Sequence, residues 1–179
     1  MITKKEFKDS LINLGVKKEM TLEVHSSLSS FGNLEGGAMT VIDTLKELVN
    51  DQGSIFMPAL RLSPELPLTQ EDKKLGITVK IKVLPREEKR TAMGLVADTF
   101  RGLEDTVCGK DVISTAGWGA HADEALKGGL FWAIHNGGKA LLLGVDIYKL
   151  TAMHYMEEIT PKEIGEVFAP SEEVNKIYP

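Results

Sequence analysis

Hydrophobic and polar positions follow two different periods over the first sixty residues. Apolar residues recur every three or four positions in 3–15 and again in 39–49, which predicts two amphipathic helices. Apolar and polar residues alternate over 20–24, and 54–57 is a short apolar run stopped by Pro58, so both segments are predicted to be strands. A strand–helix–strand order predicts a right-handed parallel crossover. The pattern therefore indicates an α/β fold.

The middle of the chain is less regular. Residues 60–76 carry prolines and charges without a period, which indicates a long surface loop. Residues 77–83 alternate apolar side chains with Thr78 and two lysines, which predicts a half-exposed strand at a sheet edge. A third helix is expected to open at Thr91 and to end at 101–102.

The last third of the chain contains the most apolar segment. Residues 140–145 predict a strand that is buried on both faces and hence central in the sheet. Short helices are predicted over 120–127 and 149–159. We find no internal repeat and no linker that would divide the chain, so residues 1–179 are expected to form a single domain. Its mixed or mostly parallel central sheet would be flanked by helices.

Composition narrows the class of protein. A content of 42% hydrophobic and 26% charged residues is typical of one globular domain with a sizeable core. The lone Cys108 provides neither a disulfide framework nor a CxxC metal site, and no metal is expected. A net charge of −5 argues against a nucleic-acid partner, and the lack of a long apolar run argues against a membrane span. We therefore expect a protein of the cytoplasm.

The stretch 24–40 is the first candidate site. A strand ends in the hydroxyl-rich turn 25–30, and a double glycine, Gly36 and Gly37, precedes the second helix. Backbone N–H groups at such a helix entrance can hold an anion, although a turn of this kind is more often only a turn. No GxSxG elbow surrounds Ser26 or Ser27, which disfavours either as a nucleophile.

The second candidate site is the predicted helix 149–159. His154 is three residues from Glu157 and four from Glu158, so either carboxylate could orient the imidazole. A neutral histidine beside a carboxylate is a plausible general base. A histidine satisfied within its own helix is an equally good interpretation.

Several motifs resemble the aminoglycoside 3-N-acetyltransferase family, also called the antibiotic N-acetyltransferases. Residues 24–32, 35–38 and 53–58 are similar to the family's N-terminal signature almost letter for letter. Thr151-x-x-His154-x-x-Glu157 resembles a second family element. Further similarities lie at 91–101, 116–119 and 141–145, and the resemblance is strongest over 20–60 and 139–158.

This resemblance implies an α/β fold unrelated to the GNAT acetyltransferases. It implies acetyl-CoA as the donor and the 3-amino group of a 2-deoxystreptamine aminoglycoside, a cationic amine, as the acceptor, and thus relatives that confer antibiotic resistance. Direct transfer would use His154 and Glu157 as general base and its partner. The residues implied to contact coenzyme A are His25, Ser26, Ser27, Leu28, Ser30, Gly36 and Gly37.

The chain also departs from the family. It lacks a His-Pro pair at the segment corresponding to Lys110 and Asp111, and the family's usual catalytic histidine is expected in a segment missing here. The region 60–91 and the C-terminus are shorter than in typical members. Two alternatives therefore stay open: a catalytically impaired homologue that binds coenzyme A, and a serine-type esterase using Ser26 or Ser27 with His154. Homodimer formation is also left open.

Overall fold

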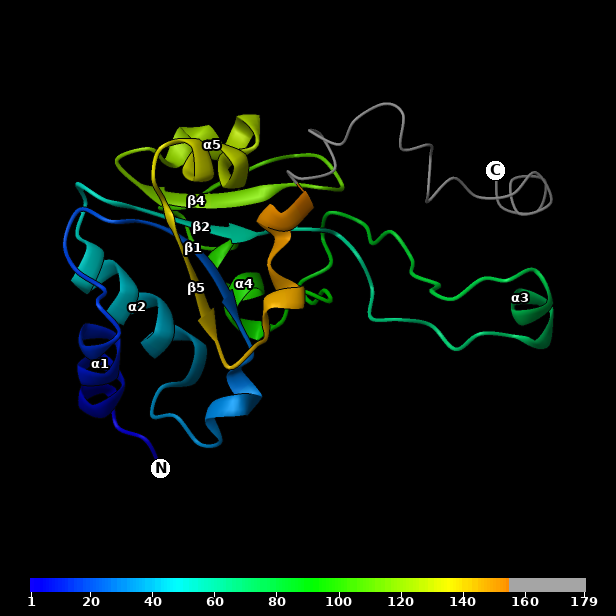
Figure 1. Ribbon diagram of the computed structural model, residues 1–179, viewed down its shortest axis with the longest axis horizontal. Coiled ribbons are helices and arrows are strands. Elements are labelled where there is room, and N and C mark those ends of the chain that lie inside the picture. Colours follow the sequence, from blue (N-terminus) through cyan, green and yellow to red (C-terminus); the bar gives the residue numbers. More distant parts are fainter. Residues whose placement is uncertain (155–179) are drawn as a thin grey trace.

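The computed structural model describes residues 1–154 (Figure 1). This part of the chain contains five strands, five α-helices and four short 3₁₀ helices. The α-helices are α1 (Lys4–Asn13), α2 (Gly37–Val49), α3 (Gln70–Lys74), α4 (Leu95–Phe100) and α5 (Gly129–His135). The strands are β1 (Thr21–Ser26), β2 (Ser54–Pro58), β3 (Val107–Cys108), β4 (Thr115–Gly119) and β5 (Lys139–Leu143). The 3₁₀ helices are η1 (Leu28–Phe31), η2 (Ala122–Lys127), η3 (Ile147–Lys149) and η4 (Thr151–His154).

The strands form one mixed sheet in the order β3-β4-β2-β1-β5. β1 is parallel to β2 and to β5, whereas β4 is antiparallel to both of its neighbours. The predicted α/β class with a mixed sheet and flanking helices is therefore confirmed. The predicted parallel crossover through α2 is also present.

The sheet is packed on both faces, and its middle strand β2 is therefore buried along its whole length. Ile55 and Met57 belong to the main core with α1, α2 and α4. Phe56 points to the opposite face, where it packs with residues of η2 and α5. The residues of β1 alternate in the same way, so Leu22 and Val24 join the main core and Glu23 takes the other face.

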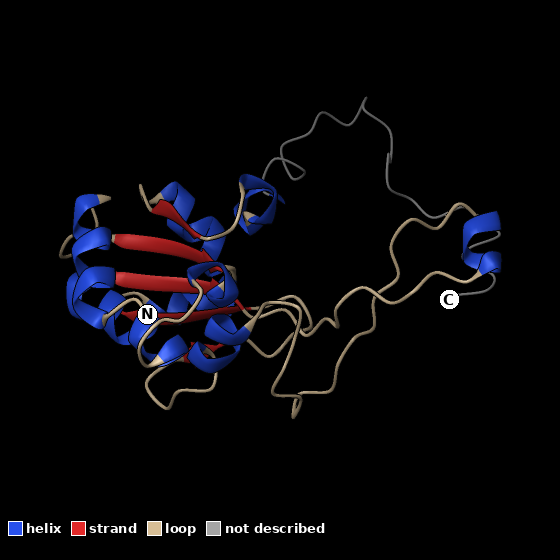
Figure 2. Cartoon of the chain, turned by 90° about the horizontal axis from the view of Figure 1, so that it is seen from below, coloured by secondary structure: helices blue, strands red, loops and turns tan. Residues whose placement is uncertain are grey.

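The predicted edge strand over 77–83 is wrong. Residues 61–90 form a long arm that extends from the body of the molecule and carries α3 at its tip (Figures 1 and 2). The two sides of the arm are linked by a bridge between Leu62 and Val83, by a few backbone hydrogen bonds and by an ion pair between Lys80 and Asp72. Val79 and Val83 remain more than half exposed because the arm does not join the sheet.

Two helix predictions also need correction. α4 begins at Leu95, because Gly94 has φ +89° and the hydroxyl of Thr91 binds Asp98. The helix predicted over 149–159 is interrupted at Leu150, which has extended backbone angles between η3 and η4. Its remainder from residue 155 lies outside the described residues. The short helix over 120–127 is confirmed as a 3₁₀ helix.

The predicted strand over 140–145 exists, but its central position is wrong. Within residues 1–154, β5 pairs with β1 alone and lies at the edge of the sheet. Lys139 and Ala140 are exposed, and only Leu143 is fully buried. An apolar run reports how much of a strand is covered, but not which strands lie beside it. No helix in the described part of the chain is long and apolar enough to cross a membrane.

Candidate functional site

A cavity of about 1280 Å³ opens at the carboxyl ends of β1 and β5. Open α/β sheets commonly bind ligands at this end of the strands. Its lining comes from Pro58 at the end of β2 and from three longer segments: 24–32 from β1 and the following loop, 90–97 before and within α4, and 144–151 after β5. Because these segments are far apart in sequence, the cavity exists only in the folded chain.

The loops after β1 and β5 are tied to each other. The backbone N–H of Ser27 donates to the carbonyl of Leu143 at 2.9 Å, and the Ser30 hydroxyl donates to the carbonyl of Gly144 at 2.8 Å. Gly144 has φ +70°, and a Cβ there would lie 2.5 Å from the Cβ of Ser30. This close approach requires glycine, so the two loops form one wall.

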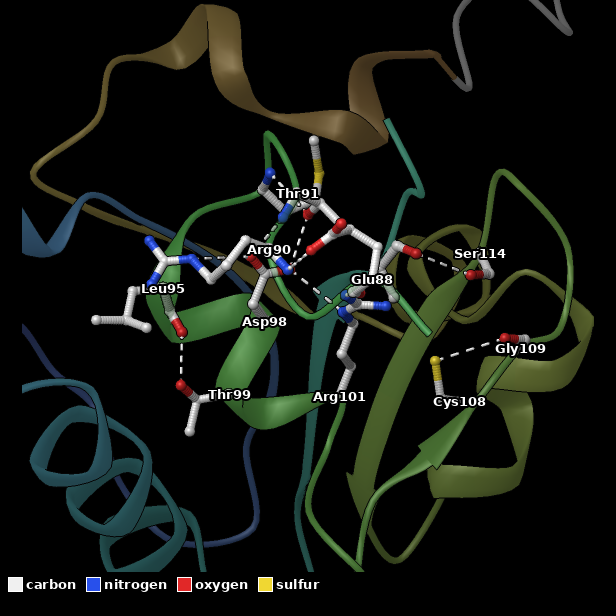
Figure 3. Close-up of polar contacts among 12 residues, drawn as sticks. Glu88, Arg90, Thr91, Leu95, Asp98, Thr99, Arg101, Cys108, Gly109 and Ser114 are labelled. Carbon is white, nitrogen blue, oxygen red and sulfur yellow. Dashed lines mark hydrogen bonds and ion pairs between the residues drawn. The ribbon is translucent and has the colours of Figure 1, made fainter. Parts of the chain in front are cut away.

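Asp98 holds the second wall in place (Figure 3). Its carboxylate accepts hydrogen bonds from the backbone N–H and the hydroxyl of Thr91 at 2.8 and 2.7 Å. The guanidinium of Arg101 donates to it at 3.2 Å and to the carbonyl of Glu88 at 2.6 Å. Arg90, whose side chain is 65% exposed, lies 3.9 Å from the same carboxylate. The charge of Asp98 therefore fixes the path of 88–94 beside the cavity.

A buried acid–imidazole pair borders the cavity through its histidine. Glu23 and His25 are neighbours on one face of β1, with 2.7 Å between Oε1 and Nε2, and their side chains are 4% and 6% exposed. The backbone N–H of Ala152 donates to Glu23 Oε1 at 3.0 Å, and the Thr151 nitrogen lies 3.3 Å from His25 Nε2. The pair thus joins β1 to η4.

Sequence reasoning missed Glu23 as a site residue. The signal was present, because a carboxylate two positions before a histidine in an otherwise apolar strand places both on the same face. Burial of both side chains was not visible in the sequence. A buried carboxylate needs partners, and the partner from η4 comes from the other end of the chain.

The structure brings together part of the predicted coenzyme set. His25, Ser26, Ser27, Leu28 and Ser30 line the cavity. Gly36 and Gly37 begin α2 and are not among the lining residues, and neither is His154, which lies exposed at the end of η4. Glu157 lies outside the described residues. The roles of all nine predicted site residues, those that line the cavity included, stay predictions.

The charged groups around the cavity are mixed. Arg90 and Lys149 supply positive charge and Asp146 supplies a negative one. Cys108 does not line the cavity, and burial raises the pKa of its thiol, which disfavours a thiolate nucleophile. Among the described residues, no group of three or more His, Cys, Asp or Glu side chains could hold a metal ion.

The family model for aminoglycoside 3-N-acetyltransferases matches residues 24–173. The chain therefore belongs to this family of acetyltransferases, as its motifs indicated. It is 28% identical over 183 residues to aminoglycoside N(3)-acetyltransferase III from Salmonella sp, covering 89% of this chain and 61% of that relative. A shorter stretch of 57 residues is 49% identical to the SPbeta prophage-derived aminoglycoside N(3')-acetyltransferase-like protein YokD of Bacillus subtilis (strain 168), covering 32% of this chain and 21% of YokD.

Solved structures share the fold. The crystal structure of YokD from Bacillus subtilis superposes with a TM-score of 0.68 at 27% identity, covering 89% of this chain and 67% of that one. The apoenzyme of aminoglycoside acetyltransferase AAC(3)-IVa gives 0.69 at 25% identity, covering 88% and 61%. The binary complex of AAC-IIIb with CoASH gives 0.68 at 21% identity, covering 89% and 65%, a likeness of fold alone. This chain thus spans roughly three fifths to two thirds of these relatives.

Proposed function

We propose that this protein transfers an acetyl group from acetyl-CoA to the 3-amino group of a 2-deoxystreptamine aminoglycoside. The observation that carries the proposal is the cavity at the carboxyl ends of β1 and β5, lined by the hydroxyl-rich loop that follows β1. Family membership supports the same reaction class. A relative with the same fold has been solved with CoASH, and a mutant of AAC(3)-IVa has been solved with apramycin.

The lining of the cavity suits both the phosphate groups and the pantetheine arm of coenzyme A. The hydroxyls of Ser26 and Ser27 offer donors to an anionic or polar chain, while Arg90 and Lys149 can pair with phosphate oxygens. Leu28 adds an apolar surface for the pantetheine arm. A volume of about 1280 Å³ exceeds that of a typical drug-sized pocket, which leaves room for a large coenzyme.

The proposed chemistry is direct transfer with both substrates bound. The acceptor amine must lose a proton before its lone pair can attack the thioester carbonyl, and His154 with Glu157 is our candidate for the group that removes it. Such a base contributes about 10²–10⁴-fold to the rate. Backbone N–H groups of the loop after β1 would stabilise the oxyanion that forms on the carbonyl.

Two alternatives make different predictions. An impaired homologue would bind coenzyme A but release no thiol in the presence of an acceptor. A serine esterase needs an imidazole that activates the hydroxyl, yet within residues 1–154 the hydroxyl of Ser27 contacts only that of Ser29, at 3.1 Å, and no imidazole binds Ser26. The geometry therefore favours the transferase.

The test is a thiol-release assay with acetyl-CoA and a panel of apramycin, sisomicin and gentamicin. We expect release that requires the acceptor, and mass spectrometry should find one acetyl group on the acceptor's 3-amino nitrogen. Calorimetry with coenzyme A alone separates an impaired homologue from a protein that does not bind it. Coenzyme A binding without acceptor-dependent release would refute the transferase. His154→Gln should lose turnover while keeping coenzyme A affinity, and normal turnover would refute His154 as the base.

A further inference from the structure

The buried pair of Glu23 and His25 makes one contact more than is needed to attach η4 to β1. Glu23 accepts the Ala152 N–H at 3.0 Å, and this bond by itself would fasten η4 to β1. The carboxylate nevertheless also holds His25 Nε2 at 2.7 Å. A ring nitrogen of a cavity-lining histidine is thereby fixed by a carboxylate that is almost fully buried.

The contacts at Nε2 decide the tautomer of His25. This nitrogen cannot donate to Glu23 and accept from the Thr151 N–H at the same time. The contact to Glu23, at 2.7 Å, is short and charge-assisted, whereas Thr151 lies 3.3 Å away. Nε2 therefore carries the proton and donates to Glu23, which leaves a lone pair on Nδ1.

The lone pair on Nδ1 is accessible. Nδ1 makes no hydrogen bond to any residue in 1–154. In the same part of the chain, the buried side-chain nitrogen and oxygen atoms without a partner are the hydroxyls of Thr44 and Thr106, and Nδ1 is not among them. Because His25 lines the cavity and Nε2 is engaged by Glu23, Nδ1 is the ring nitrogen that remains for a molecule bound there.

We propose that His25 is a catalytic residue that moves a proton between the acceptor nitrogen and the coenzyme sulfur, and that Glu23 is the residue that positions it. This inference rests on the proposed function. His25 directly precedes the loop proposed to hold pantetheine, so the thioester would react beside it. Other charged groups at the cavity are Arg90, Asp146 and Lys149.

The step balances without a further reagent. The lone pair of the amine forms the C–N bond at the thioester carbonyl, and the electron pair of the C–S bond leaves on sulfur as the thiolate. The proton lost by the attacking nitrogen passes to Nδ1, and Glu23 stabilises the resulting imidazolium. Nδ1 then delivers this proton to the thiolate, which regenerates neutral His25. The earlier proton, lost when the ammonium becomes an amine, is the one assigned to His154.

The kinetic test compares His25→Gln and Glu23→Gln with wild type, using acetyl-CoA and sisomicin. His25→Gln should lower kcat by about 10²-fold or more while KM for acetyl-CoA changes by less than about threefold. Glu23→Gln keeps an oxygen that can accept the Ala152 N–H but lacks the charge, so kcat should fall by about tenfold or more. His121→Gln is the matched control and should leave kcat unchanged, since His121 packs against the Trp132 ring and does not line the cavity.

A second measurement is independent of turnover. Nitrogen-15 NMR of the histidine rings, assigned with His25→Gln, should find the Nε2–H tautomer for His25 in wild type. Glu23→Gln should reduce the population of that tautomer. The Nδ1–H tautomer in wild type would overturn the geometry on which the inference depends.

The kinetic outcomes separate the two proposals. A wild-type protein without turnover for any acceptor overturns the proposed function and the role of His25 with it. Turnover by wild type and equally by His25→Gln overturns the role of His25 alone. Loss of kcat in His25→Gln together with a large rise in the coenzyme A dissociation constant would make His25 a binding residue and also overturn the proton-transfer role.

Discussion

Removal of the Asp98 carboxylate should destabilise the protein more than removal of any surface charge. The side chain is 2% exposed and satisfies three donors: the N–H and O–H of Thr91 and the guanidinium of Arg101. In Asp98→Ala these donors lose their acceptor, and Arg101, only 12% exposed, keeps a charge without its counter-ion. Breaking a buried ion pair in this way costs about 3–5 kcal/mol. That is a large part of the roughly 5–15 kcal/mol by which domains are stable.

Urea unfolding followed by far-UV circular dichroism measures this loss. With a slope of about 2 kcal/mol/M, the midpoint should fall by about 2 M while the slope itself stays constant. Asp98→Asn, which retains one acceptor oxygen, should lose about half as much. Asp9→Ala is the matched control, because Asp9 pairs with Lys5 on the surface and should change stability by less than about 1 kcal/mol.

The same substitution should weaken coenzyme A binding, because Asp98 fixes the 88–94 segment beside the cavity. Calorimetry on folded Asp98→Asn would detect this as a raised dissociation constant. If Asp98→Ala lost less than about 1 kcal/mol, no more than the Asp9→Ala control, the carboxylate would not be the support inferred from its hydrogen bonds. Unchanged coenzyme A affinity in Asp98→Asn would refute the link between this support and the proposed site.

Three further perturbations have defined outcomes. Gly144→Ala should lower the free energy of unfolding by about 1–3 kcal/mol and weaken coenzyme A binding, because φ is +70° and the new Cβ would meet Ser30. An unchanged melting temperature would contradict this prediction. Thr44→Val should stabilise the protein by about 1 kcal/mol, because the buried Thr44 hydroxyl has no partner among the described residues. A lower free energy of unfolding in urea would contradict this prediction. The hydrogen bond from Lys46 holds the pKa of Asp105 below its usual 3.8, so its stabilisation is full at pH 7 and is lost as the pH falls through the folded-state pKa. Asp105→Asn should therefore melt slightly below wild type at pH 7, and the difference in melting temperature should disappear once the pH has fallen below the folded-state pKa of Asp105. A difference that does not shrink in acid would refute the ionic origin.

Sequence periodicity was sufficient to predict those elements that are stabilised by their own residues. α1 lies within 3–15, where the helical period predicted it, and begins with a capping box of Thr3 and Glu6, while α2 buries the stripe that its helical period indicated. β1 and β2 also occur where alternation and the apolar run placed them. These elements need only local hydrogen bonds and one apolar face, and both are written in short-range patterns.

Predictions failed where a segment depends on its neighbours. Residues 77–83 alternate like a strand, but no sheet edge lies beside the arm to pair with them. The strand β5 is apolar enough for a central position, yet it pairs with β1 alone in the described part of the chain. Thr91 looked like the start of a helix, whereas its donors are used by Asp98, seven residues later.

The sequence by itself determined the α/β class, the acetyltransferase family and the loop 25–30 that lines the cavity. It could do so because the motifs are contiguous and the periods are local. Only the tertiary structure decided that Glu23 and His25 share a buried pair with η4 and that Asp98 supports the opposite wall. The physical reason is that a buried charge must find its partners wherever the fold brings donors within about 3 Å, and those donors can come from any part of the chain.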